Sequence, residues 1–185
     1  MPIPSFDVVR NILPPHRGDP RSPVDLSPYS CTIAELCARF ATTAKRKQIL
    51  EGFLNLRAEL FSLGIRGFQW LGGSFLEDIE RQERREPNDL DAITFVADPT
   101  APADLKAKLS AKPDLLSRNY VKATFSVDHF WVPLGWEPVY LVDQTRYWYG
   151  LFSHRRDRVW KGMLAVDLFD LAQEDGIRVA LGCRP

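Results

Sequence analysis

Apolar residues between positions 32 and 63 recur at the three- and four-residue spacing of an α-helix. Thr32 and Glu35 form a capping-box pattern, which predicts a short helix ending near Phe40. A longer helix is predicted over residues 44–62, with Gly64 placed to end it. The apolar face of this longer helix comprises Ile49, Phe53, Leu56, Leu60 and Leu63. We expect this face to lie in the core and not to bind a cofactor.

From residue 66 onward the apolar residues fall into short runs that are rich in β-branched and aromatic side chains, which is typical of strands. These runs predict strands over residues 66–71, 89–96 and 121–132, and a last strand from Val159 to about Phe169. The stretches between them predict helices over residues 103–111, 114–119 and 140–152. This order of elements predicts an α/β (α+β) domain with a small mixed, mostly antiparallel sheet covered by helices.

The start of the chain differs from the rest. Residues 1–30 hold seven prolines and show no hydrophobic periodicity, so we expect a Pro-rich N-terminal arm there. The simpler interpretation is an arm that lies along the domain surface, and the alternative is an arm that binds a partner. The chain has 185 residues, of which 45% are hydrophobic, and this is enough for one packed core. We assign that single domain to residues 31–185.

Charge and cysteine content narrow the cellular setting. Lys and Arg number 24 and so do Asp and Glu, so no overall field attracts nucleic acid or an anionic membrane. No apolar run approaches about 18 residues, the length expected of a membrane span. Cys31, Cys37 and Cys183 form an odd set without Cys-x-x-Cys spacing, and no charged and apolar leader opens the chain. A reducing cytoplasm is the simplest interpretation.

The candidate chemistry lies where two apolar runs meet polar residues. Asp89 and Asp91 are one residue apart in a predicted strand, so both side chains point to the same face. Two such carboxylates repel each other unless a divalent cation, a shared proton or nearby arginines offset them, and oxygen ligands favour Mg²⁺ or Mn²⁺. Gly72 and Gly73 allow a tight turn close to a ligand, and the Ser74 hydroxyl suits a phosphate oxygen. A phosphate-binding turn beside a metal-binding acid pair is the minimum for phosphoryl or nucleotidyl transfer.

Gly73-Ser74 followed by Asp89-Leu90-Asp91 resembles the signature of the polymerase-β-like nucleotidyltransferase superfamily, although residues 75–88 make a longer gap than in compact versions of that motif. The chain is also similar to small bacterial proteins placed in this superfamily. The likeness runs from about residue 13 to about residue 168. It includes Leu13-Pro14-Pro15, the Pro-Asn-Asp-x-Asp run, and the segment from Phe152-Ser153-His154-Arg155-Arg156 to Lys161-Gly162. The resemblance implies a nucleotidyltransferase fold.

In that superfamily a third carboxylate, on the strand beside the Asp-x-Asp pair, completes the metal site. Asp128 matches this position in order and in local pattern, and a lone aspartate in an apolar run is costly unless it is paired or binds a metal. The alternative is that Asp128 caps a strand end or pairs with an arginine. His129 falls on the opposite face and is interpreted as a packed or surface histidine.

Cations gather late in the chain, around Arg155, Arg156 and Lys161. The functional interpretation assigns these three residues to phosphate groups, because a guanidinium binds phosphate oxygens in a bidentate manner. The alternative is a solvated turn. Residues 77–86 mix acids and arginines, which favours a solvated helical turn over a binding surface. The aromatic residues of 140–152 are expected to pack on the sheet, with stacking on a nucleobase as the alternative.

The resemblance implies an enzyme that transfers a nucleoside monophosphate from a nucleoside triphosphate to a hydroxyl on a protein, a tRNA or a small molecule. Asp89, Asp91 and Asp128 would hold Mg²⁺ or Mn²⁺, and the acceptor and oligomeric state stay open. The first alternative is a binding subunit of the same fold that does not catalyse, such as a partner in a toxin–antitoxin or phage-defence system. The intact acids argue against it, because a scaffold has no physical reason to cluster like charges. A metal phosphohydrolase is less favoured, because no histidine accompanies the acids.

Overall fold

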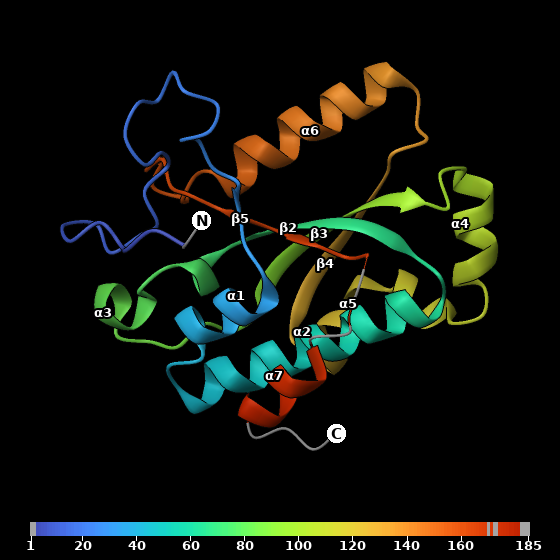
Figure 1. Cartoon of the computed structure of the whole chain (residues 1–185), viewed down its shortest axis with the longest axis horizontal. Coiled ribbons are helices and arrows are strands. Elements are labelled where there is room, and N and C mark those ends of the chain that lie inside the picture. The colour runs from blue at the N-terminus through green and yellow to red at the C-terminus, as the bar shows by residue number, and fades with distance from the viewer. Residues whose placement is uncertain (1–2, 170, 172–173, 182–185) are drawn as a thin grey trace.

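The computed structural model describes residues 3–169, 171 and 174–181, and these form a five-stranded mixed sheet with helices on both faces (Figure 1). Cys183 and the rest of residues 182–185 lie outside the described residues. The strands are β1 (Tyr29–Ser30), β2 (Arg66–Gly72), β3 (Leu90–Asp98), β4 (Val127–Pro133) and β5 (Leu164–Asp167). Their order across the sheet is β1-β5-β2-β3-β4. The predicted α+β class with a mixed sheet is therefore confirmed.

The direction of the strands is more evenly divided than the sequence analysis predicted. In the described part of the chain, β2 is antiparallel to both β3 and β5, whereas β1 with β5 and β3 with β4 are parallel pairs. Antiparallel pairing thus occupies the centre of the sheet and parallel pairing its two edges. The helical crossover between β3 and β4 is what allows these two neighbours to run parallel.

One face of the sheet is covered by α1 (Ile33–Phe40), α2 (Ala44–Ser62), α5 (Arg118–Phe125) and α7 (Glu174–Leu181), whereas α6 (Pro138–Phe152) lies over the other face (Figure 1). The remaining helices, α3 (Ile79–Glu83), α4 (Pro102–Leu109), and the 3-10 helices η1 (Ser74–Leu76) and η2 (Pro113–Leu116), lie in the connections. Local signals set the first two helices. Thr32 and Glu35 make the predicted capping box, and α2 has the predicted bounds.

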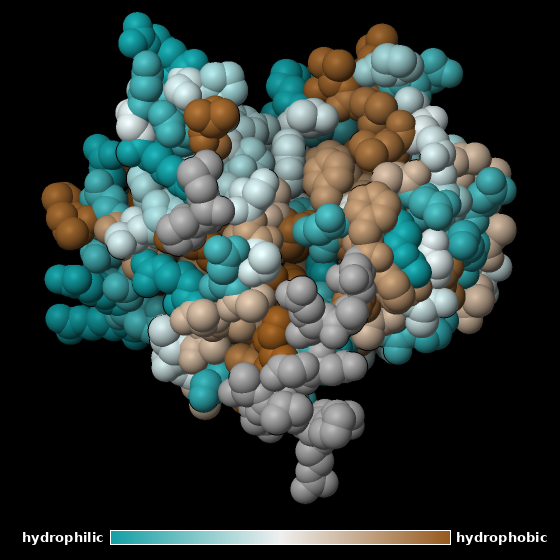
Figure 2. Space-filling model, in the orientation of Figure 1, coloured by the Kyte–Doolittle hydropathy of each residue, from teal (hydrophilic) through white to brown (hydrophobic). Residues whose placement is uncertain are grey.

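The two faces of the sheet carry separate cores because side chains alternate along each strand. On β3, Leu90, Ala92 and Val96 join the larger core beneath α1 and α2. Ile93 and Phe95 point the other way and pack in the smaller core beneath α6. On α6 itself, the face turned away from the sheet exposes apolar side chains, which form brown surface over this helix in Figure 2.

The Pro-rich arm is more closely integrated than the predicted surface arm. Ile12 and Leu13 are fully buried, and Gly162 N–H donates to the Leu13 carbonyl at 2.8 Å. Tyr29 and Ser30 add an edge strand that pairs with β5. The prediction of an arm lying on the surface was wrong for these residues, because a few apolar side chains between prolines anchor the segment without a periodic pattern.

Two predicted strands are shorter in the structure. The run 121–132 was predicted as one strand, but α5 ends at Phe125 and β4 begins only at Val127. Ser126, in the left-handed region with φ 55°, separates the two. The last strand was predicted from Val159 to about Phe169 and comprises only residues 164–167. No helix in the described ranges is both long and apolar enough to cross a membrane.

Candidate functional site

Three neighbouring strands bring the predicted site residues together. Gly72 on β2 is the register partner of Asp91 on β3, and Asp91 is in turn the partner of Asp128 on β4. The intervening residue Leu90 is fully buried in the larger core, so Asp89 and Asp91 share one face, as predicted, and this is the face covered by α6. The acid pair, the third aspartate and the glycines therefore meet where β2 ends and where β3 and β4 begin.

A cleft of about 850 Å³ opens at these strand ends. Its walls include every predicted site residue except Gly72: Gly73, Ser74, Asp89, Asp91, Asp128, Arg155, Arg156 and Lys161. Gly72 is the last residue of β2 and not part of the turn. A Cβ on Gly72 would lie 2.5 Å from the Phe152 ring, so this glycine makes room for the end of α6. The predicted phosphate-binding role of Gly72 stays a prediction, and Gly72 is not among the residues that line the cleft.

Gly73 makes the turn and borders the acids directly. Its backbone has φ 74° and ψ −172°, a region that only glycine occupies readily. A Cβ there would lie 1.7 Å from Asp91 Oδ2, so the carboxylate is packed against the Gly73 backbone. Ser74 begins η1 at the cleft wall. The backbone of the turn and the Asp91 carboxylate thus share one small space.

Two cations from α5 neutralise two of the three aspartates. Lys122 Nζ lies 2.5 Å from Asp89 Oδ2 and 3.3 Å from Asp128 Oδ2. Arg118 makes a bidentate contact, with Nε 2.5 Å from Asp128 Oδ1 and Nη2 2.6 Å from Oδ2. The Arg118 hydrogen bonds lower the pKa of Asp128, and the contacts with the acids raise the pKa of Arg118 and of Lys122. The alternative interpretation of Asp128, pairing with an arginine, is what this structure shows.

Asp91 is different. Among the residues that the structure describes, no cation forms an ion pair with its carboxylate. Burial raises the pKa of Asp91 to about 6, and the neighbouring charges of Asp89 and Asp128 contribute to the rise. The more distant ammonium groups of Lys161 and Lys122 lower it only in part. The cleft therefore contains a carboxylate whose negative charge is incompletely offset.

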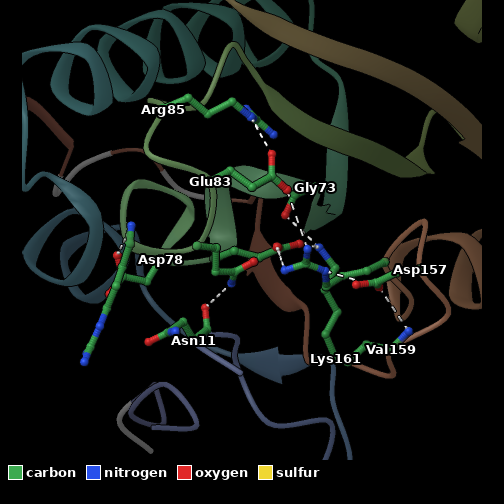
Figure 3. A network of polar contacts seen from close by, with 12 residues as sticks. Asn11, Gly73, Asp78, Glu83, Arg85, Asp157, Val159 and Lys161 are labelled. Atoms are coloured by element: carbon green, nitrogen blue, oxygen red, sulfur yellow. Dashed lines mark hydrogen bonds and ion pairs between the residues drawn. The ribbon is translucent and has the colours of Figure 1, made fainter. Parts of the chain in front are cut away.

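The predicted phosphate-binding cations form a second network beside the turn. Lys161 is buried and its Nζ donates to the Gly73 carbonyl at 2.8 Å and to Glu77 Oε1 at 2.5 Å. Burial lowers the pKa of Lys161, and Glu77 opposes this effect. Arg155 contacts the carboxylates of Glu77, Glu83 and Asp157, at 3.1, 3.5 and 3.3 Å respectively. Figure 3 shows Glu83, Asp157 and Lys161 converging on this network, which holds the Gly73 turn in place.

Arg156 stands apart from the other two predicted cations. It is exposed on the cleft wall, whereas Lys161 and Arg155 are engaged with carboxylates. Phosphate binding by any of the three stays a prediction. In this structure, Lys161 and Arg155 act on the shape of the turn.

The donor chemistry of the three aspartates fits a hard divalent cation, because six carboxylate oxygens on adjacent strands are the ligand type that Mg²⁺ and Mn²⁺ prefer. The incompletely offset charge of Asp91 is the observation that supports this fit. The oxygens are not preassembled: within the described ranges no group of three or more His, Cys, Asp or Glu is arranged to hold a metal. Arg118 and Lys122 of α5 instead contact some of the oxygens that a metal would use.

A family model described as "Family of unknown function (DUF6932)" matches residues 4–167. The chain belongs to this family. The matched region includes all five strands and every predicted site residue, whereas α7 follows it. Comparison with curated proteins and with solved structures gave no significant match.

The charged residues of the site that the sequence analysis missed include Glu77, Arg118 and Lys122. For the α5 residues a signal was present. Val121 and Phe125 are apolar and four residues apart, which is a helical spacing, although the β-branched and aromatic residue types favoured a strand. Arg118 and Lys122 then share a helix face by the same spacing. For Glu77 no local signal existed, since its partners Arg155 and Lys161 lie about 80 residues further along the chain.

Proposed function

We propose that this protein is a metal-dependent nucleotidyltransferase that moves a nucleoside monophosphate from a nucleoside triphosphate to a hydroxyl acceptor. The observation that carries the proposal is the place of Asp91. Its incompletely offset carboxylate lies against the Gly73 turn and between two further aspartates, at the edge of an open cleft. The order of Gly-Ser and Asp-x-Asp motifs, which resembles the polymerase-β-like superfamily, supports the same chemistry.

The resemblance to the superfamily suggests a role for each site residue. Asp89, Asp91 and Asp128 would hold Mg²⁺ or Mn²⁺, which when bound supplies positive charge to the phosphate oxygens and lowers the pKa of a bound hydroxyl. Gly73 and Ser74 would bind the terminal phosphates at the turn. Asp128 would help to remove the proton of the acceptor hydroxyl. The acceptor oxygen attacks the α-phosphorus, the bond to the β-phosphate breaks, and pyrophosphate leaves.

Lys161 has a positioning role in this proposal. Its ammonium holds the Gly73 carbonyl and thereby the turn against which Asp91 is packed. Because Lys161 is buried and paired with Glu77, it acts through the turn and not on the nucleotide directly.

The test is calorimetric titration of the purified protein with ATP, GTP, CTP and UTP, each with and without Mg²⁺. We expect one nucleotide to bind in a Mg²⁺-dependent manner and the Asp89→Ala/Asp91→Ala variant to lose this binding. An Asp98→Ala/Asp143→Ala variant is the matched control, because it removes two exposed carboxylates that do not line the cleft. Folded wild-type protein that binds none of the four nucleotides would refute the stand-alone enzyme.

A binding subunit that does not catalyse is the second candidate. The observation that favours it is the pairing of Asp89 and Asp128 with Lys122 and Arg118, which stabilises these acids without a metal. Such a subunit would bind its ligand equally with and without Mg²⁺. An assay of the product released from the preferred nucleotide distinguishes a transferase from a phosphohydrolase. A transferase yields pyrophosphate, whereas a phosphohydrolase yields inorganic phosphate.

A further inference from the structure

Helix α5 places two long cationic side chains at the solvent side of the acid cluster. The side chains of Arg118 and Lys122 are 59% and 47% exposed, whereas those of Asp128 and Asp89 are 6% and 15% exposed. The aspartates are fixed by the strands that carry them, and the cations reach them from solvent. The cations are therefore the partners that can leave, since water can solvate them with little rearrangement.

Lys122 competes for the same oxygens as a divalent cation. Its Nζ lies within 3.3 Å of both Asp89 and Asp128, so it bridges two of the three carboxylates that the proposed metal would use. A metal on these oxygens would face an ammonium group at close range, and two cations in contact repel strongly. Binding of the metal therefore requires Lys122 to move.

The displaced cations stay beside the cleft. Arg118 lies over the Phe130 ring, with its guanidinium carbon 4.8 Å from the ring centroid, and both Arg118 and Phe130 line the cleft. Lys122 also lines it. Once released from the carboxylates, each cation faces a cavity in which its charge is no longer offset. A ligand that brings only a metal leaves them unpaired, and a ligand that brings only phosphate leaves the acids without their cations.

A metal–triphosphate complex meets both needs at once. The metal takes the carboxylates and the phosphates take the cations, so the number of paired charges does not fall. Arg156 is exposed on the cleft wall, whereas Lys161 and Arg155 are both engaged with Glu77. Arg118 and Lys122 are therefore better placed than these two to receive phosphate oxygens.

We propose that Lys122, with Arg118, is an exchangeable counter-ion: it neutralises the aspartates in the metal-free protein and transfers to the phosphates when the metal–triphosphate complex binds. This inference rests on the proposed function for the identity of the ligand. It gives α5 a phosphate-binding role that the sequence analysis assigned only to Arg155, Arg156 and Lys161 and to the glycine turn. It also explains why the acids are not preassembled as a metal site.

The test measures two affinities in Lys122→Met. Binding of Mn²⁺ alone is followed by the electron paramagnetic resonance signal of free Mn²⁺. Binding of a non-hydrolysable analogue of whichever of the four nucleoside triphosphates binds most tightly is followed by calorimetry at saturating Mn²⁺. We expect Mn²⁺ alone to bind about 3–10-fold more tightly to the variant, because its competitor is gone, and the analogue to bind about 3–10-fold more weakly. Lys106→Met is the matched control, since Lys106 is an exposed lysine of α4 outside the cleft, and it should change neither affinity.

The two changes have opposite signs, which a general loss of structure would not produce. Lys122→Gln and Arg118→Met repeat the measurement if Lys122→Met does not fold. Mn²⁺ affinity that does not rise, or analogue affinity that does not fall, overturns the exchange while leaving the proposed function intact. Wild-type protein that binds neither Mn²⁺ nor the analogue overturns both.

Discussion

Replacing Asp91 by Asn should stabilise the metal-free protein at neutral pH. The carboxylate is packed against the Gly73 backbone and lies near two other acids, and its pKa is raised from 3.8 to about 6. A carboxyl group whose folded pKa exceeds its unfolded value binds its proton more strongly in the folded state. Its ionisation therefore costs the folded state free energy. That cost is absent below about pH 3.8, grows between pH 3.8 and 6, and is complete above pH 6.

The size of the cost follows from the change in pKa. A rise from 3.8 to about 6 corresponds to about 3 kcal/mol at roughly 1.36 kcal/mol per pH unit. Asp91 is only half-buried, and salt screens its neighbours, so we expect about 1–2 kcal/mol at pH 7. For a chain of this size that free energy raises the unfolding temperature by about 2–8 °C.

The assay is thermal unfolding of wild type and Asp91→Asn between pH 4 and pH 8, with chelator present to remove metal. The unfolding temperature of Asp91→Asn should exceed that of the wild type at pH 7, and the difference between the two should vanish near pH 4. Asp98→Asn, an exposed carboxylate at the far end of the same strand, is the control and should show no such trend. Added Mg²⁺ should stabilise the wild type and not Asp91→Asn. A variant less stable than wild type at pH 7 without metal would refute the reasoning.

Three further substitutions test the frame around the site. Gly73→Ala should destabilise the protein by about 1–3 kcal/mol from backbone strain alone, and its Cβ would also displace the Asp91 carboxylate, so thermal unfolding should show a loss. Thr94→Val should lower the free energy of unfolding, measured in urea, by about 2–3 kcal/mol, because the buried side chains of Gln69 and His129 lose the hydroxyl that they share. A loss below about 0.5 kcal/mol would contradict this. Glu174→Leu should cost about 3–5 kcal/mol in the same assay, because it leaves the buried Arg57 guanidinium without its carboxylate. Unchanged stability there would show that α7 contributes little to the fold.

Local patterns in the sequence predicted the elements whose causes are local. The capping box at Thr32, the bounds of α2 and the common face of Asp89 and Asp91 all depend on residues within a few positions of one another. The meeting of Gly73 with Asp91 was also accessible, since a strand ending in glycines and a strand beginning with acids can face each other as neighbours. For these features the sequence alone contains the information that the prediction requires.

The partners of the charged residues were not accessible in the same way. Lys161 and Arg155 were assigned to phosphates because their type suits phosphate, but Glu77, far away in the sequence, takes both. Arg118 and Lys122 were missed because Val, Thr and Phe between 121 and 125 favoured a strand, and the helix is decided by the burial of two residues against α2. Residue type predicts what a side chain can bind, whereas the fold determines which partner lies within contact distance.

The alignment of the acids depends on a buried polar network on the opposite face of the sheet. Gln69 on β2 donates to Thr94 on β3 at 2.9 Å, and Thr94 Oγ1 lies 2.7 Å from His129 Nε2 on β4. Burial lowers the pKa of His129 to about 3, so its ring is neutral and fit for this core. A slip of one residue between these strands would break both bonds and would turn an aspartate into the apolar core. The network beneath the sheet therefore fixes the register that brings Asp91 and Asp128 together above it.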